Sequence, residues 1–250
     1  MKKNKILKMI SILGISVLAM GLFAGCSKEK DVIVMGTNAE FPPFEYREGT
    51  EIVGFDVEIA KAVAKKLGKE LVIEDMAFDS LILGLNNGKM DFIAAGMTAT
   101  EERRQQVDFS EGYFHSKQAI IVKADNQDIT TADDLVGKKV GVQLGTTGDL
   151  FVSGTEGIEV VQVKKGAQAV MELQNGKIDA VVIDEEPAKQ LIVGQDGLMI
   201  LDAPFIEEEY AIAVKKGNEE LLQVIDSTLN ELKETGEYDK IYAKFFEATN

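Results

Sequence analysis

The sequence predicts an α/β protein of two lobes. Three observations predict it: strand-like and helix-like segments alternate from Asp31 onward, the alternation runs in two successive series, and a further strand and helices follow as a tail. Such alternation indicates parallel sheets covered by helices. If the tail returns to the first series, lobe one contains both ends of the chain; the order of elements alone leaves this open.

The first series lies before residue 121. Phe55, Ile59, Val63 and Leu67 form the apolar face of a helix that Gly68 ends. The segment 91–95 is apolar enough to be a strand buried on both faces. The other strands expected here are 32–35, 51–53, 71–73 and 119–122, and the other helices are 78–85 and 101–106.

The second series begins at Thr131, a residue type that caps helices. It predicts strands at 139–143, 159–163 and 180–183, and helices at 132–135, 147–152, 167–173 and 186–192. The tail predicts a strand at 211–214, a long helix over 221–232 and a last helix around 241–245. We therefore expect lobe one at 31–120 and 211–250 and lobe two at 121–210, with hinge crossings near 118–122 and 209–213.

Residues 1–25 are typical of a secretory signal, because four lysines precede an apolar run that ends at Phe23. The run is short for a membrane span. It leads into Ala24-Gly25-Cys26, which resembles a lipobox, although that motif usually has Leu at the position of Phe23. The alternative is an ordinary signal peptide with an incidental cysteine. We expect a lipoprotein signal peptide at 1–25, a lipid such as palmitate on Cys26, a tether at 26–30, and anchoring to the outer face of the cell membrane of a bacterium with a single membrane.

Composition excludes several function classes. Without residues 1–25 the chain has a formal charge of about −19, which disfavours nucleic acid and anionic lipid surfaces as partners. His115 is the only histidine and has no ligand-spaced partner, so no metal is expected. The turn at 145–148 lacks the Gly-Lys-Ser/Thr ending of a nucleotide site, and no nucleophile-base set is present. We expect a monomer with no cofactor and no catalytic residue.

Five segments, in this order, resemble one family. They are Gly36–Tyr46, Gly54–Leu67, Ala95–Arg103, Gly141–Thr147 and Lys177–Asp184. Together they make the chain similar to the bacterial extracellular solute-binding proteins of family 3, the substrate-binding lipoproteins of polar amino acid ABC transporters. The resemblance implies a type II periplasmic-binding-protein-like fold with a ligand cleft between lobes joined by two hinge strands. It also implies a substrate-binding component of an ATP-driven importer, which closes on a free polar L-amino acid and delivers it to a membrane permease.

The ligand's charged groups indicate which residues hold it. A buried zwitterion needs donors for its carboxylate and acceptors for its ammonium. Arg103 can grip a carboxylate with two parallel hydrogen bonds, and Thr147 begins a helix, where an anion is favoured. Asp184, at the end of an apolar strand, can receive the ammonium. In the family, the backbone amides at the positions of Thr98 and Thr147 help to bind the carboxylate, and the Gly96 carbonyl and Thr98 hydroxyl help to bind the ammonium.

Both charged residues have alternative interpretations. Arg103 lies in a charged run that is typical of a solvated helix face. Asp184 can instead cap the following helix.

The ligand's side chain is expected between Phe41 and Phe78, while Phe44 and Tyr46 are expected in the core. The Pro42-Pro43 pair would stiffen the loop that carries Phe41. Many relatives have an acid at the position of Asn38. The amide of Asn38 weakens the case for a lysine or arginine ligand, although Glu40 and Glu45 are near. The predicted ligand contacts are Asn38, Phe41, Phe78, Gly96, Thr98, Arg103, Gln143, Thr146, Thr147 and Asp184.

Two rival functions remain open at this point. Some proteins resembling this family are small dehydratases acting on aromatic amino acid precursors, which would require a general acid or base such as Glu40, Glu45 or Asp79. Others are sensor ectodomains of membrane kinases, which we do not expect because no spanning segment follows Phe246. We expect a binding protein, not an enzyme.

Overall fold

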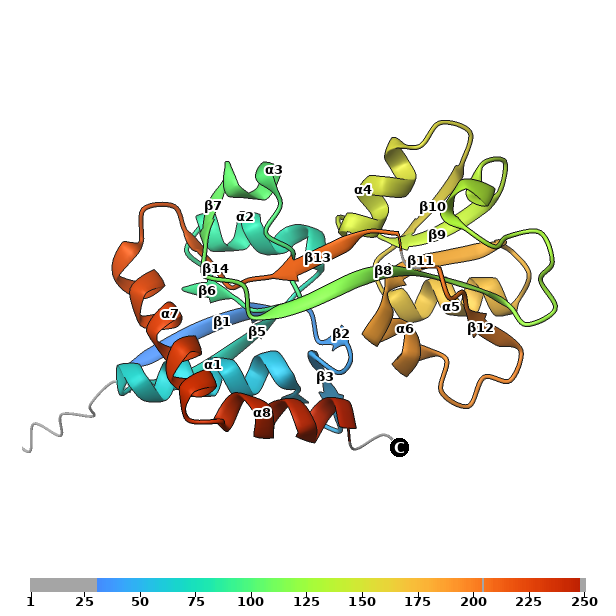
Figure 1. Cartoon of the computed structure of the whole chain (residues 1–250). Helices are drawn as coiled ribbons and strands as arrows, with labels where there is room; N and C mark the ends of the chain where they lie inside the picture. The colour runs from blue at the N-terminus through green and yellow to red at the C-terminus, as the bar shows by residue number, and fades with distance from the viewer. Residues whose placement is uncertain (1–30, 204, 248–250) are drawn as a thin grey trace, which may run out of the picture.

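The computed structural model describes residues 31–203 and 205–247. They form a two-lobed α/β structure in which long strands run from one lobe to the other (Figure 1). The predicted signal peptide, tether and Cys26 lie outside the described residues. Within the described ranges no helix is long and apolar enough to span a membrane.

The sheet of lobe one has the order β5-β1-β6-β14-β7. β1 pairs in parallel with β5 and β6, whereas β14, from the tail of the chain, is antiparallel between β6 and β7. The tail strand therefore belongs to the same sheet as the first strand. The bounds are β1 Val32–Thr37, β5 Glu70–Asp75, β6 Phe92–Ile93, β7 Val107–Phe109 and β14 Ala213–Lys215.

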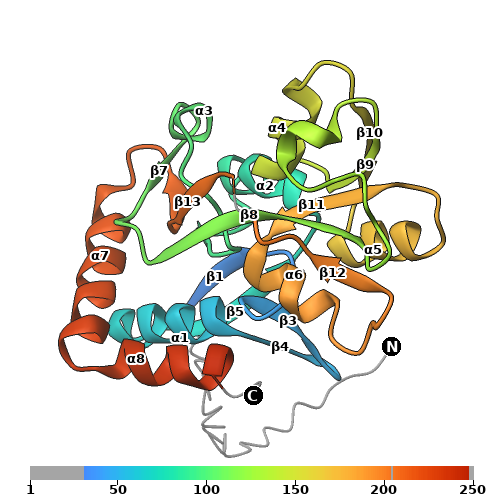
Figure 2. The same ribbon diagram turned by 45° about the vertical axis from the view of Figure 1, so that its right-hand side comes forward.

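Helices cover both faces of this sheet. Ile33 and Met35 of β1 pack into the cluster beneath α1, while Val34 packs against the cluster that contains Leu81 of α2. Alternate residues of a strand point to opposite faces, which is why the successive residues Ile33, Val34 and Met35 are all apolar. α1, α7 and α8 lie side by side (Figures 1 and 2). The helices are α1 Phe55–Leu67, α2 Leu81–Asn86, α3 Glu101–Arg104, α7 Glu219–Glu234 and α8 Glu237–Tyr242.

Several helix ends differ from prediction. α1 ends as expected at Gly68, whose φ of 68° lets its N–H reach the Lys65 carbonyl. The helix expected at 78–85 is split into a 3-10 turn at Phe78–Ser80 followed by α2, and α8 begins before the predicted start. A small antiparallel sheet projects beside α1: β2 Glu40–Phe41, β3 Glu45–Glu48 and β4 Glu51–Val53.

The sheet of lobe two has the order β10-β9-β11-β8-β12. β9 pairs in parallel with β10 and β11, and β8 is antiparallel to β11 and β12. The predicted strands and helices of the second series are present, with ends shifted by one or two residues. Their bounds are β9 Lys139–Gln143, α4 Thr147–Gly154, β10 Glu159–Val163, α5 Gly166–Gln174, β11 Ala180–Asp184, α6 Glu185–Leu191 and β12 Leu198–Ile200.

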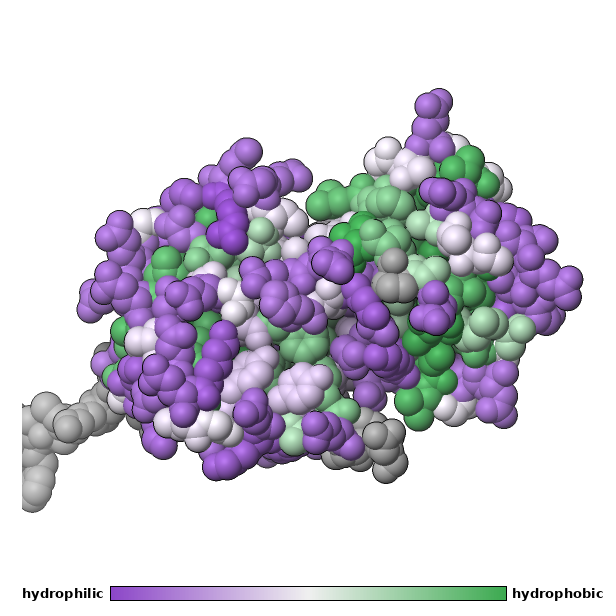
Figure 3. All heavy atoms as spheres, in the orientation of Figure 1, coloured by the Kyte–Doolittle hydropathy of each residue, from purple (hydrophilic) through white to green (hydrophobic). Residues whose placement is uncertain are grey.

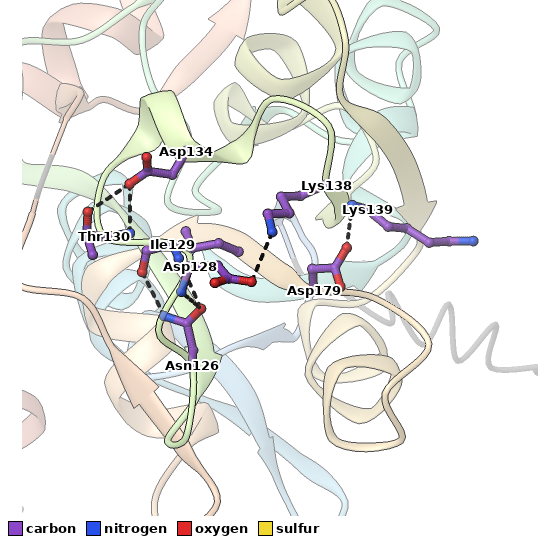
Figure 4. Close-up of polar contacts among 8 residues, drawn as sticks. All are labelled: Asn126, Asp128, Ile129, Thr130, Asp134, Lys138, Lys139 and Asp179. Atoms are coloured by element: carbon purple, nitrogen blue, oxygen red, sulfur yellow. Dashed lines mark hydrogen bonds and ion pairs between the residues drawn. The ribbon is translucent and has the colours of Figure 1, made fainter.

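The entry to β9 is held by short polar contacts (Figure 4). Thr131 caps the next turn as predicted, in a reciprocal arrangement with Asp134, although the turn at Ala132–Leu135 is 3-10 helix. Asn126 closes the preceding loop by donating to the Ile129 carbonyl at 2.7 Å. The Lys139 amide donates to Asp179 at 2.8 Å, which connects the start of β9 to the segment before β11.

The two lobes are connected by a pair of strands. β8, Phe114–Lys123, pairs with β13, Glu207–Tyr210, before it enters the sheet of lobe two. This paired ladder lies slightly before the expected hinge crossings, and the predicted division of the chain at 120 and 210 stays a prediction. β12 and β13 are absent from the sequence-based assignment, because β12 is short and the acidic run in β13 masks its alternation of exposed and buried residues.

Candidate ligand-binding site

A small, narrow pocket lies where the lobes meet. The molecular surface is notched between the lobes near α3 and α4 (Figure 3). Every residue predicted to contact the ligand lines this pocket, together with Glu45 and Ala95, which were not predicted. Their roles in binding stay predictions. The lining is Asn38, Phe41, Glu45, Phe78, Ala95, Gly96, Thr98, Arg103, Gln143, Thr146, Thr147 and Asp184.

The strand ends bring these residues together. Asn38 follows β1 and Gly96 lies shortly after β6, while Gln143 and Asp184 end β9 and β11. In open α/β sheets small molecules bind outside the carboxyl ends of the strands, because the loops there converge. The two sheets present such ends toward one another, one from each lobe.

We name one side of the pocket the Arg103 wall, made of Thr98, Arg103, Thr147 and Asp184. Arg103 is only 7% exposed, whereas Arg104 next to it is exposed, so the solvated-face interpretation of Arg103 is wrong. Its Nη1 donates to the Thr98 carbonyl at 2.7 Å, and its Nη2 donates across the cleft to the Gly145 carbonyl at 3.0 Å. The guanidinium carbon lies 5.3 Å from the centre of the Phe78 ring.

Electrostatics around Arg103 follow from this burial. Burial lowers the pKa of Arg103, and the carboxylates of Glu208 and Asp184 oppose that shift. The backbone N–H of Arg103 donates to the Thr100 hydroxyl at 3.2 Å, which caps α3.

Asp184 lies at the first boundary of α6 but makes no side-chain capping bond. Instead its Oδ1 accepts a hydrogen bond of 2.5 Å from the Tyr210 hydroxyl. The carboxyl is buried, and desolvation together with the neighbouring Glu208 raises the pKa of Asp184 well above its ordinary value. The side chain of Asp184 therefore does not cap α6, and the helix-cap interpretation is wrong.

The start of α4 contributes the two threonines. Thr146 caps the helix by accepting from the Asp149 N–H at 3.3 Å, and its hydroxyl donates to the Gln143 carbonyl at 2.8 Å. Thr147 is the first residue of α4, so its N–H belongs to the end of the helix that favours anions. Its hydroxyl oxygen accepts from Gln118 of β8 at 3.3 Å.

We name the other side the Glu45 wall, made of Asn38, Glu45 and Gln143. The Gln143 amide donates to Asn38 Oδ1 at 2.8 Å, which joins the lobes, and Asn38 donates to the Met76 carbonyl at 2.9 Å. Glu45 is 0% exposed, and neither of its oxygens accepts a hydrogen bond from the described residues. Burial, and then the nearby Asp56 carboxyl, raise the pKa of Glu45 well above its usual range.

Asp56 is better satisfied than its neighbour. It accepts from the Gly96 N–H at 2.8 Å and from the Tyr113 hydroxyl at 2.7 Å. Burial nevertheless raises the pKa of Asp56 to about 6. Two buried carboxyls in contact favour sharing a proton over ionising together, and a cationic group that entered the pocket beside Glu45 could take the place of that proton.

The acids considered for catalysis are dispersed. Glu40 pairs with Lys165 and Asp79 is exposed, so of these candidates Glu45 alone lines the pocket of the described structure. Across residues 31–203 and 205–247 no group of three His, Cys, Asp or Glu could hold a metal ion.

Sequence reasoning missed the residues behind the pocket. Glu208 and Gln118 lie on the hinge strands and bond to residues of the Arg103 wall, and Tyr210 contacts Asp184. In β13 only alternate residues are buried. The sequence Glu-Glu-Glu-Tyr of this strand gives no sign of that alternation, because three successive acids hide which of them is buried.

Known proteins resemble the chain over its described length. The model of the family described as bacterial extracellular solute-binding proteins, family 3, matches residues 33–248. The arginine-binding extracellular protein ArtP of Bacillus subtilis is 37% identical over 253 residues, covering 98% of each chain. An ancestral arginine-binding protein bound to arginine has a TM-score of 0.84 at 44% identity, covering 87% of this chain and 99% of that one. An ancestral arginine-binding protein bound to glutamine has a TM-score of 0.83 at 45% identity, with 87% and 98% covered.

Proposed function

Because the chain belongs to the bacterial extracellular solute-binding proteins of family 3, we propose that it is the substrate-binding component of an ATP-driven importer for L-arginine. The observation that carries the choice of arginine is Glu45: a buried acid on the pocket wall whose two acceptor oxygens have no donor among the described residues. A guanidinium offers five N–H donors in a plane and stays charged when buried.

The backbone part of the ligand would lie on the Arg103 wall. Asp184 would receive the ammonium, and Arg103 with the N–H groups at the start of α4 would receive the carboxylate. Arg103 already donates to two carbonyls, so a carboxylate would use its remaining N–H groups. Any free L-amino acid satisfies these requirements, and this wall therefore does not select arginine.

The side chain would extend between Phe41 and Phe78 toward the Glu45 wall. Flat rings suit a flat guanidinium because stacking and cation–π attraction act together. Similarity to arginine-binding proteins supports the same ligand. This similarity outweighs the sequence argument that the amide of Asn38 disfavours a cationic ligand, because Glu45 supplies the acid that position 38 lacks.

Closure would couple binding to transport. The pocket draws contacts from both lobes, so the ligand gains its full set of bonds only when they meet, and binding increases the closed population. Strands β8 and β13 would act as the hinge, with 31–120 and 211–250 as one moving body and 121–210 as the other. A membrane permease would then recognise the closed form of this monomer.

The chain would be held at the outer face of the membrane by a lipid on Cys26, as its N-terminal sequence predicts. If so, Cys26→Ser should release the protein into the medium, while a Ser27→Ala control stays with the cells. Cys26→Ser protein that remains in the membrane fraction after processing would contradict the anchor.

A thermal-shift screen of the twenty amino acids on the purified protein tests the ligand. A ligand at a hundred times its dissociation constant stabilises a protein by about 2.7 kcal/mol. We expect the largest shift with L-arginine and a smaller one with L-glutamine. A largest shift with an acidic or aliphatic amino acid would overturn the assignment, and turnover of prephenate or arogenate would favour an enzyme.

A further inference from the structure

Glu208 is a buried acid in the hinge and is not a lining residue of the pocket. Along β13 the side chains of Glu207 and Glu209 are exposed, and that of Glu208 points inward. A buried carboxylate is costly unless it accepts hydrogen bonds, so its partners indicate what it does.

Both oxygens of Glu208 accept bonds from residues that lead to the Arg103 wall. Oε2 accepts from the Thr98 hydroxyl at 2.8 Å. Oε1 accepts from Nε2 of Gln118 at 3.1 Å, and the same nitrogen donates to the Thr147 hydroxyl oxygen at 3.3 Å. The chain of bonds therefore runs from lobe one, through the hinge strands, to lobe two.

These partners determine the direction of each hydroxyl. A carboxylate only accepts, so Thr98 must spend its one hydrogen on Glu208, and its oxygen lone pairs are left for the pocket. The amide nitrogen of Gln118 only donates, so Thr147 accepts there and its hydrogen is left for the pocket. A flipped Gln118 would put its carbonyl oxygen against a carboxylate, which disfavours that orientation.

We propose that Glu208 is a positioning residue that directs two threonine hydroxyls on opposite lobes. It presents Thr98 as an acceptor for the ligand's ammonium and, through Gln118, Thr147 as a donor for the ligand's carboxylate. The proposal rests on the amino acid binding function proposed above. It adds that the hinge sets the polarity of the site, because Glu208 and Gln118 lie on the paired strands that connect the lobes.

Glu208→Gln tests the contact between Thr98 and the ligand's ammonium. The glutamine carbonyl can keep the bond from Gln118, which leaves its NH₂ facing Thr98. The Thr98 oxygen then accepts from that NH₂, and its hydrogen turns toward the pocket, where the ammonium also presents hydrogens. The link from Gln118 to Thr147 is preserved, so the Thr147 hydroxyl should still direct its hydrogen toward the ligand's carboxylate.

The test is calorimetry with two probes, L-arginine and 5-guanidinopentanoic acid, which is arginine without its α-amino group. Glu208→Gln should weaken arginine binding about tenfold or more and change the dissociation constant of the des-amino acid by less than about threefold. Glu209→Gln, the same substitution at the adjacent exposed position, should change neither. In a Thr98→Val background, Glu208→Gln should have no further effect on arginine.

Three results would overturn the inference: parental arginine affinity in Glu208→Gln, equal losses for both probes, or a full further loss in the Thr98→Val background. Equal losses would mean that Glu208 only supports the hinge. If Glu208→Gln does not fold, Thr98→Val decides, because it should weaken arginine binding and spare the des-amino acid. A parent protein that binds none of the twenty amino acids would overturn the proposed function itself, and this inference with it.

Discussion

The two walls of the pocket differ in how completely their polar side chains are hydrogen-bonded within the protein. On the Arg103 wall, Arg103, Thr98, Thr147 and Asp184 all have hydrogen-bond partners within the protein. On the Glu45 wall, Asn38 and Gln143 bond to each other across the lobes, but both oxygens of Glu45 lack donors among the described residues. The difference teaches that features shared by all amino acids can be met by a preformed network, whereas selectivity can rest on one buried group that the ligand completes.

Asp184→Asn tests the Arg103 wall and should have the largest effect. The ligand's buried ammonium would lose its charged partner, so affinity should fall by roughly 2–5 kcal/mol. Asparagine resembles the protonated acid, so the unliganded melting temperature should hardly change. Calorimetry and thermal melts measure both, with exposed Asp202→Asn as the control. Parental affinity in the variant would mean that another acid receives the ammonium.

Glu45→Gln tests the other wall. A buried guanidinium without its carboxylate should lose roughly 2–4 kcal/mol of binding, while glutamine, which has no charge on its side chain, should lose much less. Competition calorimetry with both ligands gives the ratio, and exposed Glu51→Gln is the control. Equal losses for the two ligands would remove the distinction between the walls.

The same variant predicts a change in the pH dependence of stability. Because the pKa of Glu45 is raised in the folded protein, that protein keeps a proton which the unfolded chain releases above its ordinary value of 4.5. The contribution of Glu45 to stability is therefore complete below that pH and declines as pH rises. Glu45→Gln should flatten this decline, so the unliganded variant should melt above the parent at pH 7 and close to it at pH 4. A lower melting temperature at pH 7 would show that Glu45 already has a partner.

Arg103→Lys should weaken all amino acid ligands alike, by about 1.5–3 kcal/mol. Lysine carries the charge but cannot reach both carbonyls and a carboxylate with a planar fork. Arg104→Lys, at the neighbouring exposed position, is the matched control. Calorimetry with arginine and glutamine checks the result, and a loss confined to arginine would assign Arg103 to side-chain recognition instead.

The rim of the cleft, outside both walls, should contribute least. Lys165 of lobe two contacts Glu40 of lobe one at 2.5 Å, with side chains 55% and 30% exposed. Exposed pairs contribute about 0–1 kcal/mol and are screened by salt. A double-mutant cycle with Glu40→Gln and Lys165→Gln should give a coupling in this range that vanishes at high salt. A larger, salt-insensitive coupling would make the pair part of the closing mechanism.

The sequence alone was enough to predict two lobes of alternating strands and helices, most of the individual helices and strands, and the residues that gather at the pocket. It succeeded where a local pattern has a single physical cause: the apolar stripe that Gly68 ends, the cap at Thr131, and apolar strands that end in polar residues. Family resemblance then assigned roles to residues such as Arg103, which local pattern alone would have left on a solvated face.

Only the tertiary structure decided what these residues touch. Asp184 occupies a capping position yet bonds to Tyr210, and β14 joins the sheet that β1 began. Glu45 and Glu208 are acids, a residue type that is usually exposed, and yet both are buried in the folded chain. Burial and bonding between distant segments depend on packing in three dimensions, and a local pattern of residue types does not encode them.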